Sequence, residues 1–148
     1  MFQPRQIIYF KEFYFKNGNT AKPKYLIILG RIQDKTIVAS LPTRTNNAPA
    51  LVNTLHGCIN LDDRCYNCYV FEQGRSICEN GFGFDLPTYI YGNQVEDYDI
   101  EILEDVYKIK GVDYEEKGML TQQEFRSILE CILNSSSTKR KIKRLLQQ

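Results

Sequence analysis

The stretch KYLIILGRIQDKTIVASLPTRT, residues 24–45, decides the expected fold. It holds two apolar runs, KYLIILG (24–30) and KTIVASL (35–41), separated by the short polar segment RIQD. Short, nearly continuous apolar runs rich in Ile and Val are typical of buried β-strands, and a short polar connection between them favours a hairpin. We therefore predict two adjacent core strands.

The second of these strands ends abruptly. Pro42 stops the apolar run, and Thr43, Arg44 and Thr45 follow at once, so two hydroxyls flank a guanidinium. One interpretation is a polar strand end whose hydroxyls bond the local backbone. The other is a phosphate site, because hydroxyl and guanidinium groups held together stabilise the charge of a phosphate. The pattern leaves both open.

Further strands are predicted on both sides of this hairpin. Residues 6–15 are β-branched and aromatic and precede an Asn-Gly turn, and strand signals return at residues 68–74, 76–84 and 88–92. Residues 45–64 are rich in Asn, Pro and Asp, which predicts a long loop. Residues 100–111 fit neither period cleanly, and we favour a strand for their second half.

The most regular pattern lies near the C-terminus. In LTQQEFRSILECILN (120–134), Thr121 and Glu124 have the spacing of a capping box. Apolar residues recur there at helical intervals, which predicts an amphipathic helix over 122–133: they are Phe125, Ile128, Leu129, Ile132 and Leu133. The predicted fold is mainly β, a small antiparallel β-barrel over residues 1–134 with one long loop and this C-terminal helix, followed by a short basic tail or helix, 135–148.

Composition restricts the class of protein. A chain of 148 residues fits one domain, and no apolar run approaches the roughly 18 residues that a membrane span requires. Charged residues interrupt the apolar residues of the N-terminus, so we expect no signal peptide, no membrane association and a cytoplasmic location. The formal net charge is only +1, because the basic tail offsets a mildly acidic body. Any nucleic-acid binding therefore has to use a local basic patch or the basic C-terminal tail.

Four segments resemble the PemK/MazF family of ribonuclease toxins in their order along the chain and in their local residue patterns. They are AKPKYLIILG (21–30), TIVASLPTRT (36–45), FEQGRSICENGFGFDLPTYI (71–90) and KGMLTQQEFRSILECIL (117–133), within about residues 6–133. The resemblance implies an SH3-like barrel with a C-terminal helix, which acts as a homodimer and is neutralised by a separately encoded antitoxin protein. It also implies cleavage of single-stranded RNA without metal or cofactor, through attack of the 2′-hydroxyl on the phosphate.

The site residues of the family are carried over position by position. The basic residue at the head of the second strand corresponds to Lys24, and the hydroxyl at the end of the third corresponds to Thr43, so the resemblance implies that both are catalytic. Family members usually have arginine where this chain has Lys24, and an ammonium lacks the bidentate fork of a guanidinium. Arg44 and Arg31 can supply a guanidinium from other positions, and we assign them with Thr45 to RNA or phosphate binding.

His56, the only histidine, lies in the predicted long loop. A lone histidine is more often a surface or hydrogen-bonded residue than a catalyst. Cleavage through a 2′-hydroxyl nevertheless needs a base and an acid, and histidine suits either task near neutral pH. We therefore include His56 among the candidate catalytic residues.

The five cysteines, an odd number without an export signal, indicate reduced thiols or a metal site rather than a disulfide framework. Cys65 and Cys68 form a C-x2-C pair, and with Cys58 and Cys78 they make four possible zinc ligands. A second tight pair is missing, and cysteine among aromatic residues is commonly a small buried hydrophobe. We predict no metal, with this zinc site as the alternative, and place Cys131 in or beside the core.

Two functions stay open at this point. The first is a toxin-like endoribonuclease of a toxin–antitoxin system. The second is a barrel of the same fold that lacks catalysis and binds nucleic acid or another protein, with or without a stabilising zinc ion. The lysine at the family's arginine position and the acidic body favour the second function, whereas the order of the four segments favours the first.

Overall fold

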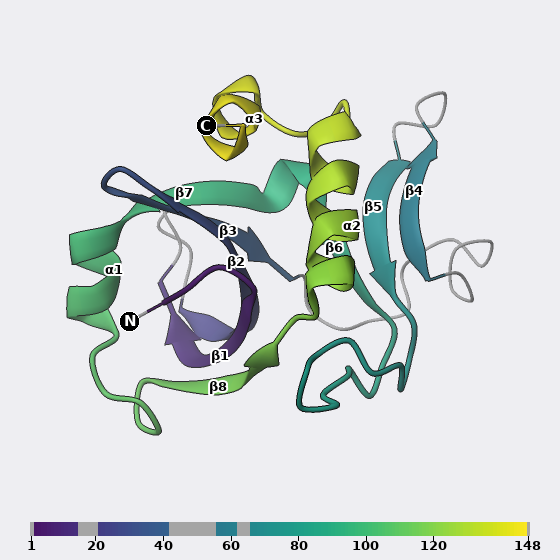
Figure 1. Cartoon of the computed structure of the whole chain (residues 1–148). Helices are drawn as coiled ribbons and strands as arrows, with labels where there is room; N and C mark the ends of the chain where they lie inside the picture. The colour runs from purple at the N-terminus through teal and green to yellow at the C-terminus, as the bar shows by residue number, and fades with distance from the viewer. Residues whose placement is uncertain (1, 15–20, 42–55, 62–65, 148) are drawn as a thin grey trace.

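The computed structural model describes residues 2–14, 21–41, 56–61 and 66–147, and its strands form two antiparallel sheets (Figure 1). The larger sheet has the strand order β7-β3-β2-β1-β8, and the smaller has the order β4-β5-β6. The strands are β1 (Gln6–Phe13), β2 (Lys22–Ile32), β3 (Lys35–Ser40), β4 (Gly57–Leu61), β5 (Tyr66–Phe71), β6 (Thr88–Tyr91), β7 (Val95–Asp99) and β8 (Tyr114–Met119). The helices are α1 (Ile100–Val106), α2 (Gln122–Asn134) and α3 (Arg140–Leu146), with a 3₁₀ turn, η2, at Gly92–Gln94. None of these described helices has the length and apolar character needed to cross a membrane.

The fold is thus mainly β with helices at the C-terminus, as predicted, and the hairpin that decided this prediction is confirmed. Strands β2 and β3 pair antiparallel, with Leu26 opposite Ser40. Their apolar runs are continuous because the large sheet is buried on both faces. Ile27 and Ala39 face a core that they share with α2 and α3, whereas Leu26 and Val38 face a second core that includes α1.

Helix α2 stands between the two sheets (Figure 1), and the predicted cap at its N-terminus is confirmed. The Thr121 hydroxyl accepts the backbone N–H of Glu124 at 3.2 Å. In a complete capping box the Glu124 side chain would return to the N–H of Thr121. That N–H instead donates to the carbonyl of Ile77 at 3.1 Å. The Glu124 carboxylate is therefore available for other contacts.

Three predictions of secondary structure are wrong. Part of the predicted long loop forms β4, which pairs with β5, while residues 45–55 and 62–64 of that loop lie outside the described residues. Residues 76–84 form a turn and an isolated bridge between Cys78 and Leu120 rather than a strand. Residues 100–111 begin with α1, and their second half contains no strand.

The C-terminal tail packs onto the rest of the chain. Helix α3 buries Ile142 in the same core as α2, with Leu145 and Leu146 packed against it. The ammonium of Lys141 lies 3.2 Å from the carboxylate of Asp97 on β7, and Lys139 pairs with Glu96 on the same strand. Part of the positive charge of the tail is therefore neutralised within the molecule.

Candidate active site

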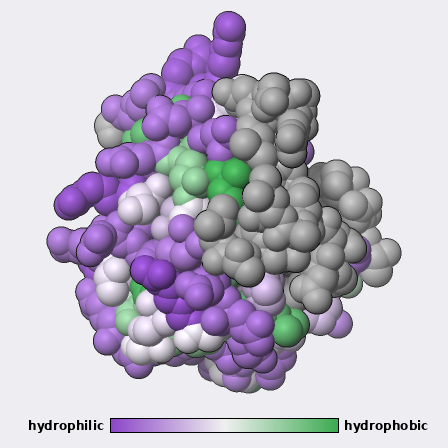
Figure 2. Space-filling model, turned by 90° about the vertical axis from the view of Figure 1, so that its right-hand side faces the viewer, coloured by the Kyte–Doolittle hydropathy of each residue, from purple (hydrophilic) through white to green (hydrophobic). Residues whose placement is uncertain are grey.

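A cleft of about 600 Å³ lies beside α2, where the helix faces β4 and β5. Its lining is mainly polar and includes His56, Tyr69, Arg75, Glu124, Ser127 and Glu130. The described part of the surface on the small-sheet side of the molecule is also mainly hydrophilic, with a small hydrophobic patch near its centre (Figure 2). This cleft suits a polar ligand.

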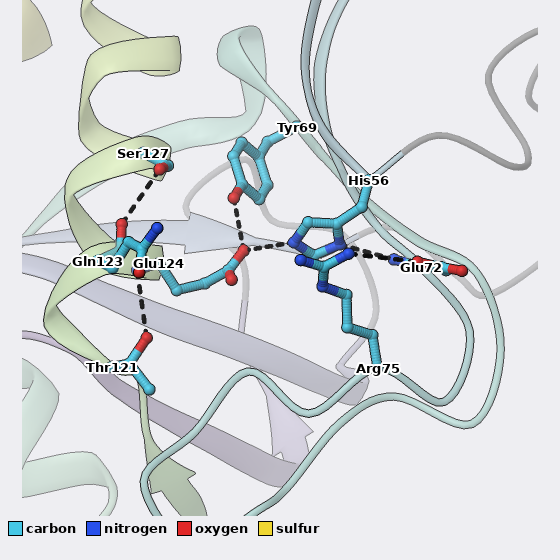
Figure 3. Close-up of polar contacts among 8 residues, drawn as sticks. All are labelled: His56, Tyr69, Glu72, Arg75, Thr121, Gln123, Glu124 and Ser127. Atoms are coloured by element: carbon cyan, nitrogen blue, oxygen red, sulfur yellow. Dashed lines mark hydrogen bonds and ion pairs between the residues drawn. The ribbon is translucent and has the colours of Figure 1, made fainter.

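The Glu124 carboxylate is the centre of the cleft's hydrogen bonds (Figure 3). Its Oε2 atom accepts the hydroxyl of Tyr69 at 2.5 Å and lies 2.7 Å from Nε2 of His56. The side chains of His56 and Glu124 are only 10% and 13% exposed, so these contacts are largely shielded from water. Both donors use Oε2, and within the described part of the chain Oε1 is the oxygen left for a ligand.

A backbone contact fixes the tautomer of His56. The backbone N–H of Glu72 donates to Nδ1 of His56 at 3.1 Å, so Nδ1 is an acceptor and carries no proton. The ring proton is therefore on Nε2, which donates to Glu124. In this arrangement the imidazole is neutral and orients the carboxylate, while Glu124 is the group with an unused acceptor.

Tyr69 is held in its protonated form. Burial, followed by the hydrogen bond to Glu124 and the charge of that carboxylate, raises the pKa of Tyr69 above its ordinary value of 10.0. The ring is 2% exposed and lies edge-on to the imidazole of His56, with the centroids 5.9 Å apart. Tyr69 is therefore a fixed hydrogen-bond donor that holds Glu124 in place.

Arg75 supplies the positive charge of the cleft. It lies on the connection between β5 and β6, and its Nη1 atom is 3.5 Å from the carboxylate of Glu72. Both side chains are about half exposed, so this ion pair is weak and a phosphate can compete for the guanidinium. The charge of Arg75 also acts on the hydroxyl of Tyr69 and opposes part of the rise in its pKa. Arg75 is therefore close enough to the hydrogen bonds around Glu124 to influence them.

The cysteines differ from the prediction. Cys58 on β4 and Cys131 on α2 form a disulfide, with their Cα atoms 5.5 Å apart, so the expectation of reduced or metal-bound thiols is wrong for both. The bridge removes Cys58 from the alternative zinc set, and Cys65 lies outside the described residues. Cys68 and Cys78 are separate buried thiols, and among the described residues no three potential ligands are grouped as a metal site requires.

The structure describes only part of the phosphate site expected from the resemblance. Thr43, Arg44 and Thr45 lie outside the described residues. The N–H of Leu41 donates to the carbonyl of Tyr25 at 3.1 Å, so the chain leaves β3 beside the head of β2, where Lys24 lies. Burial, and then the charge of Lys22, lowers the pKa of Lys24. These contacts are compatible with the expected pairing of Lys24 and the strand end.

Neither Lys24 nor Arg31 lines the cleft around Glu124. Three ring contacts, Tyr25 to Phe84, Phe84 to Phe71 and Phe71 to His56, lie between the neighbour of Lys24 and the cleft. Arg31 lies near the opposite end of β2, where its Nη1 atom bonds the carbonyl of Phe2 and the carboxylate of Glu104 at 2.9 and 3.0 Å. The structure therefore brings together His56 with Tyr69 and Glu124, but does not bring Arg31 to Lys24.

No protein-family model matches the sequence, and no curated protein matches it either. The chemistry of the cleft is therefore the main basis for assigning a function. Of its central residues, the sequence patterns single out only His56; Glu124 was expected to cap α2, and no pattern indicates Tyr69 or Arg75.

Proposed function

We propose that the protein is a metal-independent endoribonuclease that cleaves single-stranded RNA at the cleft beside α2. The observation that carries this proposal is the convergence of His56 and Tyr69 on one oxygen of Glu124, in a polar cleft that both Glu124 and Arg75 line. A fixed carboxylate beside a cation matches the two needs of the reaction, a base for the 2′-hydroxyl and a counter-charge for the phosphate.

The residues of the cleft supply the base and the counter-charge, and water supplies the acid. Glu124 Oε1 takes the proton of the 2′-hydroxyl, the 2′-oxygen bonds phosphorus, and the bond from phosphorus to the 5′-oxygen breaks. The 5′-oxygen takes a proton from water in the open cleft, and the protonated Glu124 neutralises the hydroxide that remains. Arg75 stabilises the charge of the five-coordinate phosphorane. His56 and Tyr69 hold the carboxylate in the orientation that this transfer needs.

The remaining expectations belong to the same proposal. In it, the two sheets and α2 form an SH3-like barrel of the PemK/MazF type, which works in the cytoplasm as a homodimer under the control of an antitoxin protein. Lys24, with Thr43, Arg44 and Thr45, binds a phosphate of the RNA outside the cleft. The half-exposed position of Lys24 at the head of β2 supports this assignment.

The test is cleavage of single-stranded RNA by the purified protein in EDTA. We expect products ending in a 2′,3′-cyclic phosphate and no cleavage of 2′-O-methylated RNA, because the attacking group is then blocked. Glu124→Gln keeps the size of the side chain but removes the base, and it should lower the rate at least about 100-fold. Glu101→Gln, an exposed change on α1, is the matched control and should leave the rate unchanged.

The same assay separates two possible catalytic centres. If Lys24→Ala and Thr43→Ala abolish cleavage while Glu124→Gln does not, the chemistry takes place at the strand end and the proposed role of Glu124 is wrong. If the wild-type protein leaves RNA intact, the endoribonuclease proposal fails as a whole.

A specific observation favours the second candidate, a binding module without catalysis. Both ring nitrogens of His56 already have partners, and the Glu124 contacts join α2 to the small sheet, as a purely structural cluster would. Under this alternative the protein binds single-stranded RNA without cutting it, with an affinity that falls steeply as salt rises. Fluorescence anisotropy with a labelled oligonucleotide distinguishes the two.

A further inference from the structure

Two links join the β4 segment to α2 along the cleft. His56, directly before β4, bonds Glu124 at 2.7 Å, and Cys58 is bonded to Cys131. His56 and Cys58 are two residues apart and both reach α2, at Glu124 and Cys131, which are two helical turns apart on the same face of the helix. The hydrogen bond and the disulfide therefore run side by side between the same two elements.

We propose that Cys58 and Cys131 are positioning residues for the cleft. Their disulfide holds the start of β4 against α2 so that His56 reaches Glu124. Reduction, the usual state of cytoplasmic thiols, lets His56 move away while β4 stays paired with β5, so the site is fully active only when oxidised. The catalytic consequence rests on the proposed function, whereas the positioning of His56 does not.

The disulfide is the covalent link between β4 and α2, and the other contacts that hold β4 there are non-covalent: its pairing with β5 and the hydrogen bonds of His56. Strand β4 is a five-residue edge strand whose only strand neighbour in the described structure is β5. Of its apolar residues, Ile59 has a described side chain, which packs with Cys68, Val70 and Tyr89 on the small sheet and not with the core around α2. Among the contacts of the described residues, the bridge is the covalent hold that keeps the start of β4 beside Glu124.

The two sulfurs differ in access, and this defines the route of reduction. Cys58 is exposed, whereas Cys131 is 4% exposed. A thiolate from a small thiol or dithiol attacks the sulfur of Cys58, the S–S bond breaks, and its electron pair leaves with the sulfur of Cys131, which then takes a proton. A second thiolate attacks the mixed disulfide on Cys58, so two thiols lose two electrons and become a disulfide while both cysteines become thiols.

After reduction, the Cys131 thiol has a hydrogen-bond acceptor already in place. The sulfur of Cys131 lies 3.6 Å from the carbonyl oxygen of Cys68, so a Cys131 thiol finds an acceptor without any rearrangement of α2. Cys78 does not compete for the bridge, because burial and the charges of Glu124 and Glu79 raise the pKa of its thiol to about 12. Reduction therefore affects β4 and leaves the helix in place.

The experiment compares oxidised protein with protein reduced by dithiothreitol. Because His56 is the only histidine, its imidazole protons are identified directly by NMR. In the oxidised protein we expect nuclear Overhauser effects between His56 and the ring of Tyr69; reduction should remove them and lower RNA cleavage at least about tenfold, and reoxidation should restore both. Cys58→Ser should resemble reduced wild-type protein under both conditions, and the matched variant Cys78→Ser should keep the full redox response.

Each other result has a defined meaning. Overhauser effects that persist after reduction, with or without a fall in cleavage, would overturn the inference. Their loss together with the far-ultraviolet circular dichroism signal would also overturn it, because the bridge would then support the fold as a whole. Loss of the effects in a protein that cleaves no RNA in either state would support the positioning role and reject the endoribonuclease proposal.

Discussion

The hydrogen bond between Tyr69 and Glu124 gives the sharpest quantitative prediction. The hydroxyl of Tyr69 lies 2.5 Å from Oε2 of Glu124, and the tyrosine is 2% exposed. A buried hydrogen bond to a charged acceptor contributes about 1.5–3 kcal/mol to stability. We therefore expect Tyr69→Phe to lower the free energy of unfolding by about 2 kcal/mol, whereas Tyr14→Phe, at a residue that is 57% exposed, should change it by less than about 0.5 kcal/mol.

A double-mutant cycle with Glu124→Gln isolates this contact. Urea unfolding of wild type, both single variants and the double variant should give a coupling of about 2 kcal/mol, since the residues touch directly. His56 keeps its own contact with residue 124 in Tyr69→Phe, so the cycle does not measure that bond. A coupling below about 0.5 kcal/mol would contradict the central place of Glu124 in the cleft.

The same bond predicts a dependence on alkaline pH. Burial first, and then Glu124, raise the pKa of Tyr69 in the folded protein, while the unfolded tyrosine titrates near 10.0. The stabilisation is fully present below about pH 10, and it is lost as pH rises further, because only the unfolded chain then releases the proton. The loss for one such group is up to about 1.4 kcal/mol per pH unit. Tyr69→Phe should remove this part of the slope, and an unchanged slope would contradict the assignment.

Three further predictions test other parts of the structure. Replacing Cys58 and Cys131 by alanine should lower the free energy of unfolding, measured in guanidinium, by about 4 kcal/mol. The reason is that the bridge closes a loop of 73 residues in the unfolded chain. A loss under about 1 kcal/mol would argue against the bridge. Burial raises the pKa of Cys78 from 9.0 to about 12. At pH 8 this thiol should therefore react with iodoacetamide about 1,000-fold more slowly in the folded protein than in urea-unfolded protein, as followed by mass spectrometry. Equal rates in the two states would refute its burial. Gly83→Ala should cost about 3 kcal/mol in thermal unfolding, since its Cβ would lie 2.1 Å from the carbonyl oxygen of Arg75. Gly74→Ala, where the Cβ meets nothing within 4 Å and only the φ of +76° is unfavourable, should cost about 1 kcal/mol, and equal effects of the two changes would contradict the packing of the Arg75 loop.

The elements predicted correctly are those whose sequence carries its own signal. The β2–β3 hairpin has continuous apolar runs in the middle of both strands because both faces of its sheet are covered, and α2 combines an N-cap with an apolar stripe. Such patterns follow from local geometry and burial alone.

The elements that were missed depend on distant contacts. Strand β8 is an edge strand in which three consecutive charged residues, 115–117, separate buried Tyr114 from buried Gly118, so it has almost no apolar signal and is defined by its pairing with β1. Helix α1 has apolar residues, but most of them are not buried. Its Ile102 and Val106 are exposed and Leu103 alone is buried, so the apolar residues of its sequence do not mark the buried face.

The candidate site was hard to predict because its residues have ordinary local explanations. Glu124 fits a capping box, and only the fold shows that the Thr121 N–H bonds Ile77 and leaves the carboxylate to His56 and Tyr69. The partner of Cys58 lies 73 residues away, and a general argument from compartment and cysteine number cannot identify such a pair. His56 could be singled out because histidine is a candidate acid or base wherever it occurs.

The spacing within α2 connects the proposed chemistry with the proposed redox control. Thr121 begins the helix, Glu124 lies in its first turn, and Cys131 follows two turns later on the same face. A carboxylate in the first turn also lies at the positive end of the helix dipole, which favours negative charge at that point. Because the base and the sulfur share one rigid element, a change at the disulfide cannot move Glu124 without moving the helix, whereas it can move β4 and His56. The redox state should therefore act on the partner of the carboxylate and not on the carboxylate itself, which is why the contact of His56 with Tyr69 is the decisive observable.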